Sequence, residues 1–491
     1  MKYLYLSVIS LMFAFSNAQF KDLELDKSIN QKATAEINGK KIDFQVETGT
    51  QALFRDKQAK ASIHYTYYKK TDTDLKKRPL LISFNGGPGS ASVWMHLAYT
   101  GPKILNVTDE GFPIQPYGIK DNPHSVLDVA DILYVNPVNT GYSRPVKNKD
   151  GKYDRSDFFG VQADIEYLAE WINLFISRHN RWLSPKFLIG ESYGTTRVSG
   201  LALALQNRQW AYLNGVILVS PTGLGIDRSG PVSAGNKLPY FTAAAWYHDQ
   251  LPQELQELTL EEVLLKSETF TEKKLIPGLL LGSALTEDKK QELSKTYAAY
   301  SGLSQIEVLE QNINVPYNYF WKNLLKSKEF TVGRLDSRYR GIDKKVGGVR
   351  PDYNVELTSW LHSFTPAVNY YFQEYLGLKT DLKYNMFGSV RPWNRKDDKT
   401  GEMLRQALAS NKNLHVLVQS GYYDGATTYY NAKYTLRHID PSGKLSDRLN
   451  LKLYKSGHMM YLRNEDLETA NNDLRSFIKN ALKESGKPAK Y

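Results

Sequence analysis

The pentapeptide Gly190-Glu191-Ser192-Tyr193-Gly194 constrains the fold of this 491-residue chain more than any other stretch. It follows a short apolar run at 187–189 and precedes good helix formers up to Leu205. In such a G-x-S-x-G pattern the serine lies on a sharp strand-to-helix turn, and the glycines allow that turn without a Cβ clash. Backbone N–H groups at a helix N-terminus attract negative charge. The pattern predicts Ser192 as an acyl-transfer nucleophile, with an ordinary surface turn as the alternative.

Compact apolar runs of strand length recur along the chain and alternate with segments of helical spacing. The predicted strands lie at residues 79–84, 129–135, 187–189, 215–219, 413–418 and 449–454. Helical spacing is found at 161–175, after Ser192 and at 467–482. Apolar strands separated by helices are typical of a largely parallel sheet covered on both faces, so we predict an α/β fold. An Asn-Gly turn at 38–39 and the alternation at 61–68 predict antiparallel strands at one edge.

The segment 226–375 differs in character from the rest of the chain. It contains charged helical stretches such as 258–265 and no comparable strand run. We predict a helical cap insertion over the carboxyl edge of the sheet, where ligands bind in α/β folds. The predicted domains are therefore a core at 19–225 and 376–491, with the cap between them.

The N-terminus has the pattern of a secretory signal peptide. Lys2 precedes an apolar run at 3–15, and Ser16-Asn17-Ala18 forms a small-x-small cleavage site. The run is shorter than the roughly 18 to 20 residues that cross a bilayer, so a membrane anchor is the weaker alternative. We expect residues 1–18 to be removed after export to a periplasmic or extracellular location, with no stable membrane insertion afterwards.

Composition narrows the chemistry further. The chain has no cysteine, which excludes disulfides, thiolate metal sites and a cysteine nucleophile. Its net charge is +11, but the basic residues are interleaved with acids, as in 69–78. This pattern favours solvated loops over a nucleic-acid surface. No zinc spacing of the H-E-x-x-H kind is found, and we predict neither a metal nor a cofactor.

The order of the catalytic partners limits the choice of a base for Ser192. On an elbow fold the acid follows the serine and the histidine follows the acid. His458 comes just after the predicted strand 449–454, where a loop would present an imidazole to the carboxyl edge of the sheet. His438 lies in a helical pattern and is the alternative base.

The predicted acid is Asp424, which ends the stretch 416–424. It would accept a hydrogen bond from the imidazole, fix its tautomer and stabilise the imidazolium. An Asx turn with Gly425 is the alternative role, and it is compatible with the same backbone. Asp440 and Asp447 are less well placed.

The loop Asn85-Gly86-Gly87-Pro88-Gly89 follows another predicted strand. Its glycines allow a backbone N–H to approach a substrate oxygen, and with the N–H of Tyr193 this would form an oxyanion hole. A glycine loop can also cradle phosphate. However, the lysine and the Ser/Thr that complete a P-loop are absent here, and so is G-x-G-x-x-G.

Several segments together resemble the signature segments of the serine carboxypeptidase family, peptidase family S10, which has the α/β-hydrolase fold. They are Asn85-Gly86-Gly87-Pro88-Gly89-Ser90-Ala91-Ser92, Asn136-Pro137-Val138-Asn139-Thr140-Gly141-Tyr142-Ser143, Gly190-Glu191-Ser192-Tyr193-Gly194, Gly421-Tyr422-Tyr423-Asp424 and Gly457-His458-Met459. The segments 238–248 and 332–339 resemble bacterial members in particular. Where many members carry a cysteine, this chain has Ser90-Ala91.

The resemblance implies a role for each matching residue. The roles are Ser192 as nucleophile, Asp424 and His458 as its partners, Gly87 and Tyr193 as oxyanion hole, and Asn85, Gly86 and Glu191 as the site for the terminal carboxylate of the substrate. A carboxyl group facing a carboxylate forms a hydrogen bond only when the two share a proton. We therefore expect peptide cleavage to be favoured at acidic pH.

The leading hypothesis is an exported serine-type carboxypeptidase that acts on the C-termini of peptides or proteins through an acyl-enzyme. The alternatives are an esterase or acyltransferase on the same fold, and an inactive peptide-binding homologue. The pair Asn85 and Glu191 distinguishes a carboxypeptidase from an esterase or acyltransferase, because a substrate without a terminal carboxylate does not need these two side chains for binding.

Overall fold

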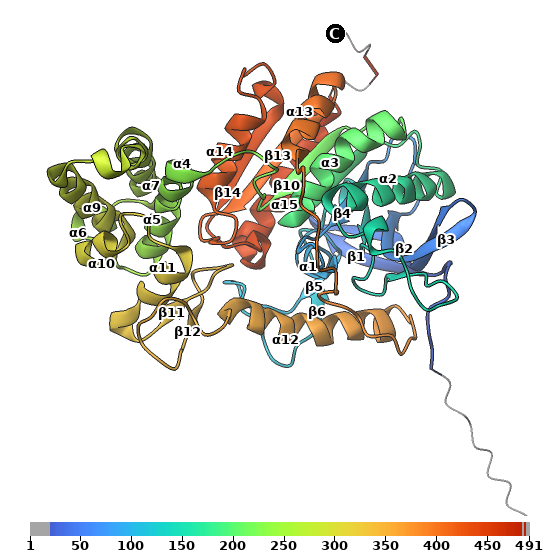
Figure 1. The fold of residues 1–491 in the computed structure, drawn as a ribbon. Helices are drawn as coiled ribbons and strands as arrows, with labels where there is room; N and C mark the ends of the chain where they lie inside the picture. Colours follow the sequence, from blue (N-terminus) through green and yellow to red (C-terminus); the bar gives the residue numbers. More distant parts are fainter. Residues whose placement is uncertain (1–19, 484–485, 488–491) are drawn as a thin grey trace, which may run out of the picture.

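The computed structural model describes residues 20–483 and 486–487, so the predicted signal peptide lies outside the described residues. Within the described part, one large sheet forms the centre of the molecule (Figure 1). Its strands are, in spatial order, β1 (Lys27–Ile37), β2 (Lys40–Arg55), β3 (Gln58–Lys70), β7 (Asp131–Val135), β4 (Leu80–Phe84), β9 (Lys186–Glu191), β10 (Gly215–Val219), β13 (His415–Gly421) and β14 (Leu449–Tyr454), with β8 (Arg144–Pro145) paired to β3. All neighbouring pairs from β7 to β14 are parallel.

The other end of the sheet is antiparallel, as the sequence predicted. The turn between β1 and β2 has positive φ at Asn38 (52°) and Gly39 (68°), a conformation that an Asn-Gly pair tolerates. The alternating segment 61–68 lies in β3, which pairs with both β2 and β7. At this end of the sheet β1 is the edge strand, and β3 lies inside the sheet between β2 and β7.

Both faces of the sheet are buried, which explains the continuous apolar runs. In β9, Phe187 and Ile189 belong to one hydrophobic cluster and Leu188 to another on the opposite face. The first cluster includes α1 (Val93–Ala98), α12 (Val355–Tyr370) and α15 (Asn464–Ala481). The second includes α2 (Val161–Arg178), α3 (Tyr193–Arg208), α13 (Thr400–Ser410) and α14 (Tyr429–Ile439). This covering on both faces confirms the predicted α/β class.

A helical lobe is inserted between β10 and β13, and it lies to one side of the sheet (Figure 1). Its helices are α4 (Gly230–Gly235), α5 (Leu238–Tyr247), α6 (Gln253–Gln256), α7 (Leu260–Phe270), α8 (Ile276–Leu280), α9 (Glu287–Ser301), α10 (Gln305–Glu310) and α11 (Tyr317–Asn323). The lobe has a hydrophobic cluster of its own, from Leu238 to Val332.

After the lobe, the hairpin of β11 (Thr331–Val332) and β12 (Arg340–Gly341) leads back to the core. The next helix, α12, buries Trp360 and Phe364 in a cluster of the central sheet. The cap boundaries at 226 and 375 stay a prediction. A small hairpin of β5 (Lys103–Leu105) and β6 (Ile119–Asp121) lies near α12 (Figure 1). In the described ranges, no helix combines the length and apolar character needed to cross a membrane.

Candidate active site

The turn at Ser192 has the strand-turn-helix geometry that the pentapeptide predicts. The strand β9 ends at Glu191, α3 begins at Tyr193, and Ser192 between them has φ 57° and ψ −124°. A Cβ at position 190 would lie 2.2 Å from the carbonyl oxygen of Gly194. Glycine is therefore required at 190 by close backbone contact. A positive φ at a non-glycine residue is a strained conformation of the kind found at functional sites.

His458 and Asp424 form a buried hydrogen-bonded pair. The Nδ1 atom of His458 lies 2.7 Å from Oδ2 of Asp424, and Asp424 is fully buried. The other carboxylate oxygen of Asp424 accepts hydrogen bonds from the backbone N–H groups of Ala426 (2.8 Å) and Thr427 (3.0 Å). The turn contacts and the contact with His458, which the sequence offered as alternative roles for Asp424, are thus made by different oxygens of one carboxylate.

The charge around His458 favours its protonated form. Burial lowers the pKa of His458, but the carboxylates of Asp424 and Glu191 outweigh that effect, so the pKa is raised. An imidazole in this setting can take a proton from a nearby hydroxyl because the resulting imidazolium is stabilised by Asp424.

One cavity of about 470 Å³ collects almost all the residues that the sequence singled out. Its walls include Asn85, Gly86, Gly87, Glu191, Ser192, Tyr193 and His458. Asp424 is the exception, since it lies behind His458 and is shielded from solvent. His438, the alternative base, bonds instead to the carbonyl of Tyr434 on α14 (2.8 Å) and is not among the lining residues.

The glycine loop after β4 packs directly against the start of α3. A Cβ at Gly86 would lie 2.5 Å from the backbone nitrogen of Tyr193. Arg197 on α3 donates to the carbonyl oxygen of Asn85 (2.6 Å) and forms a buried ion pair with Asp164 (2.8 Å). The loop at Asn85 and Gly86 is therefore held against the start of α3 in a fixed arrangement of the kind that an oxyanion site needs.

Glu191 is buried next to Asn85 and Tyr461. One of its oxygens, Oε2, accepts hydrogen bonds from the amide of Asn85 (2.6 Å) and the hydroxyl of Tyr461 (2.6 Å). The backbone N–H of Met95 donates to Oδ1 of Asn85 (3.1 Å), which turns the Asn85 amide N–H toward Glu191. Burial raises the pKa of Glu191 to about 7. At acidic pH this side chain is thus a neutral acid that can donate a proton to a carboxylate.

Three residues around the site, Thr427, Tyr461 and Arg197, were not predicted from the sequence. The hydroxyl of Thr427 lies 2.7 Å from Oδ2 of Asp424 and 3.2 Å from Nδ1 of His458. Thr427 follows Asp424 by three residues and Tyr461 follows His458 by three, and that proximity is the one sequence cue available. Arg197 offers no such cue, because its partners Asp164 and Asn85 are distant in the chain.

Comparison with known proteins points to one family. The family model described as serine carboxypeptidase matches residues 39–463. Serine carboxypeptidase-like 8 of Arabidopsis thaliana is 28% identical over 162 residues, which are 33% of this chain and 35% of the relative. The lysosomal protective protein of Mus musculus is 28% identical over 202 residues, 40% of this chain and 38% of the relative.

A fungal relative extends the comparison to a solved structure. The pheromone-processing carboxypeptidase KEX1 of Zygosaccharomyces rouxii is 33% identical over 151 residues, 30% of this chain and 20% of the relative. The crystal structure of the prohormone-processing carboxypeptidase KEX1(delta)P from Saccharomyces cerevisiae aligns with a TM-score of 0.54 and 15% identity, covering 89% of this chain and 92% of that one. The structural likeness confirms the predicted α/β-hydrolase fold. The chain spans less than half the length of each of these curated relatives.

Proposed function

Because the chain belongs to the serine carboxypeptidase family, we propose that it removes the last amino acid from peptides or proteins through an acyl-enzyme on Ser192. The observation that carries this proposal is the buried Glu191–Asn85 pair in the same cavity as Ser192 and His458. A simple esterase needs a nucleophile and a base, but it does not need a buried carboxyl group whose pKa is raised to about 7, so that it is protonated at acidic pH.

In the proposed reaction, the Ser192 hydroxyl attacks the carbonyl carbon of the last peptide bond while His458 takes its proton. The tetrahedral oxyanion accepts hydrogen bonds from the backbone N–H groups of Gly87 and Tyr193. His458 then gives the proton to the leaving nitrogen, the C–N bond breaks, and the free amino acid departs. Water, deprotonated by His458, attacks the ester and releases the shortened peptide with Ser192 restored.

The terminal carboxylate of the substrate is proposed to bind at Asn85, the Gly86 backbone and Glu191. Asn85 can donate from its amide, and protonated Glu191 can donate from its carboxyl group. Both groups are buried, so the hydrogen bonds form in a site of low dielectric, where an unpaired partner is costly. Selectivity for the last peptide bond would follow, because only a substrate with a terminal carboxylate can pair with both buried donors.

The pH dependence of peptide cleavage follows from the titration of Glu191. Since its pKa is raised to about 7, Glu191 loses its proton as the pH rises through that value, and a carboxylate would then face the carboxylate of the substrate. We expect kcat/KM for free-acid peptides to fall about tenfold per pH unit above that point. Glu191→Gln keeps an N–H donor that does not titrate, so this alkaline fall should disappear.

The control for this prediction is an ester substrate without a carboxylate, assayed over the same pH range. Its kcat/KM should rise with pH until His458 is neutral and should show no alkaline fall. Peptide cleavage that stays level from about pH 4.5 to about pH 8 and is unaltered in Glu191→Gln would contradict the role of Glu191.

The experiment that tests the proposed function compares an N-blocked dipeptide with its C-terminal amide. We expect cleavage of the free acid and a loss of about 10²-fold or more in kcat/KM for the amide, because the neutral amide cannot form a charge-assisted hydrogen bond with protonated Glu191. Equal cleavage of both would favour an esterase or acyltransferase of the same fold, and cleavage of neither would favour a peptide-binding homologue.

We also propose that the mature protein begins at Gln19 and acts outside the cytoplasm, in the periplasm or the extracellular space. The proposal is supported by the signal-peptide pattern of residues 1–18.

A further inference from the structure

The segment 333–339, which connects β11 and β12 of the insertion, contacts the loops of both His458 and Asp424. The sequence singles it out as a motif, and the reaction proposed above gives it no role. Toward the Asp424 loop, the backbone N–H of Gly425 donates to the carbonyl of Arg334 (2.9 Å). The backbone N–H of Ser337 donates to the carbonyl of Tyr423 (3.0 Å). Each residue next to Asp424 in the chain is therefore bonded to the insertion.

The same segment holds the backbone of His458. The N–H of His458 donates to the carbonyl oxygen of Leu335 at 2.6 Å, and the carbonyl of His458 accepts from the hydroxyl of Ser220 at 2.7 Å. Ser220 directly follows the central strand β10, whereas Leu335 belongs to the insertion. The position of the histidine is thus shared between the sheet and the inserted segment.

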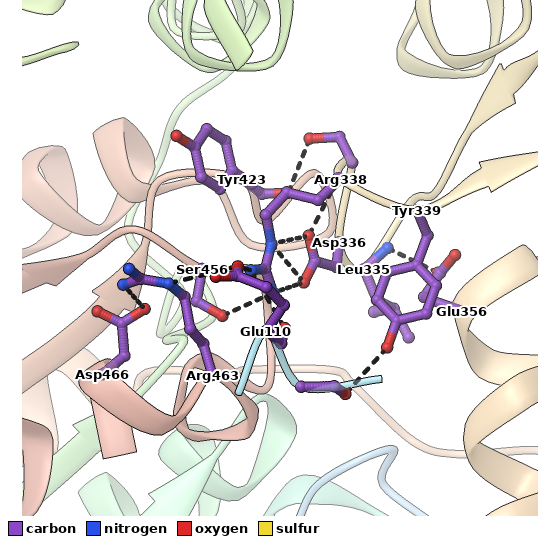
Figure 2. A network of polar contacts seen from close by, with 12 residues as sticks. Glu110, Leu335, Asp336, Arg338, Tyr339, Glu356, Tyr423, Ser456, Arg463 and Asp466 are labelled. Carbon is purple, nitrogen blue, oxygen red and sulfur yellow. Dashed lines mark hydrogen bonds and ion pairs between the residues drawn. The ribbon is translucent and has the colours of Figure 1, made fainter. Parts of the chain in front are cut away.

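A buried ion pair fastens this segment to the histidine loop. Figure 2 shows Arg338 pointing toward Asp336 and Ser456, with contacts drawn to both. The guanidinium bonds to Asp336 at 2.6 Å and to the Ser456 hydroxyl at 3.1 Å. The Asp336 and Arg338 side chains are each only 2% exposed. A buried pair of this kind is rigid, because breaking it leaves an uncompensated charge.

The contact between segment and loop is also sterically close. A Cβ at Gly457 would lie 2.5 Å from the Cβ of Asp336, so the residue before His458 lies directly on Asp336. On the far side of the segment, the buried carboxyl of Glu356 on α12 accepts from the N–H of Leu335 at 2.7 Å (Figure 2). The hydrogen bond to α12 therefore holds the segment in place, and the segment cannot move away from His458 without losing buried hydrogen bonds.

We propose that Asp336 and Arg338 are positioning residues for catalysis: their ion pair, with Ser456, holds the segment 333–339 as a clamp that fixes the His458 imidazole relative to Ser192. The clamp rests on the proposed function in so far as His458 acts as the base. It gives the insertion a catalytic purpose besides covering the cavity. A base displaced by about 1 Å from its reactive position can cost about 10²-fold in rate, so a small relaxation of the loop suffices.

The test is Asp336→Asn, which preserves shape but leaves the buried Arg338 cation with only the exposed carboxylate of Glu110, 3.7 Å away, as a counter-charge. Active sites are counted first with a fluorophosphonate that labels Ser192, and kcat is then expressed per labelled site. We expect kcat per site to fall about 10- to 100-fold for both an ester and a free-acid dipeptide, with KM within about threefold. The rate of labelling should fall in parallel, because it too depends on His458.

A matched control separates positioning from stability. Asp343 forms an equally buried ion pair with Lys322 (2.5 Å, side chains 2% and 3% exposed), and its other hydrogen bond comes from the N–H of Asp352. Asp343→Asn should reduce the yield of folded protein, and kcat per labelled site should stay within about twofold of the unaltered enzyme. If Asp336→Asn behaves like this control, with fewer labelled sites but an unchanged kcat per labelled site, the clamp is wrong.

A milder variant keeps the proposal testable if Asp336→Asn does not fold. Ser456→Ala removes only the hydroxyl that Arg338 donates to, and we expect kcat per site to fall about three- to tenfold. An unchanged kcat per site in this variant would also overturn the clamp. If the unaltered enzyme is labelled by the fluorophosphonate but cleaves no peptide, the proposed substrate is refuted, and the kcat for the ester decides whether the clamp is correct. If the unaltered enzyme is not labelled, the proposed function and the clamp are both refuted.

Discussion

Ser192→Ala is expected to lower kcat for a C-terminal peptide bond by about 10⁴- to 10⁶-fold. The reason is that the substitution removes the atom that forms the acyl bond and leaves the cavity and its hydrogen-bond donors in place. Binding of the released C-terminal amino acid should therefore change little, since the proposed carboxylate site at Asn85 and Glu191 is intact. The measurement is kcat and KM on a free-acid dipeptide, together with calorimetric binding of the product.

Fluorophosphonate labelling provides the control for this result. The unaltered protein should gain one adduct, located by mass spectrometry on the peptide that contains Ser192, and Ser192→Ala should gain none. Thr195→Ser is a matched variant on the same turn, because Thr195 donates its hydroxyl to the Ser192 carbonyl (2.6 Å) and serine keeps that donor. Activity in Ser192→Ala within about tenfold of the unaltered enzyme would disprove the nucleophile.

Asp424→Asn is expected to lower kcat by about 10³- to 10⁴-fold with the fold intact. The carbonyl oxygen of an asparagine can keep the hydrogen bonds from the N–H groups of Ala426 and Thr427. Its NH₂ group then faces Nδ1 of His458, which must become an acceptor, so the proton moves to the nitrogen that should act as the base. The loss should appear in kcat for ester and peptide alike.

The substitution should also shift the acid limb of the pH profile. Burial lowers the pKa of His458 and the Asp424 carboxylate raises it, so removal of that charge should bring the pKa down. The acid limb of ester hydrolysis would then move to lower pH. Asp440→Asn serves as the control at another candidate acid, where the carboxylate bonds to the nearby Ser442 and Leu445 and not to His458. Comparable losses in both variants would contradict the assignment of Asp424.

The parts of the site that could be predicted from the sequence are those encoded within a few residues. The turn at Ser192 depends on glycines at 190 and 194, whose close contacts are backbone contacts that no other residue allows. The loop after β4, Asp424 and His458 could be located because each directly follows an apolar strand, and the ends of parallel strands meet at one edge.

The contacts between distant segments could not be predicted in the same way. Tyr461 reaches Glu191 from a position 270 residues away, and Arg338 reaches Ser456 from a position 118 residues away. No periodicity or turn preference relates such positions. The motif at 332–339 lies in the predicted insertion, but nothing in its residues indicates that Leu335 bonds to the backbone of His458.

The sequence by itself determined the α/β class, the strand-turn-helix at Ser192 and the candidate residues of the cavity, because local backbone sterics and the burial of apolar strands dictate those features. The tertiary structure decided the electrostatic state of Glu191 and the support of His458 by the insertion. Both depend on which groups are brought together and shielded from water. Burial raises the pKa of Glu191 to about 7, even though the hydrogen bonds from Asn85 and Tyr461 lower it.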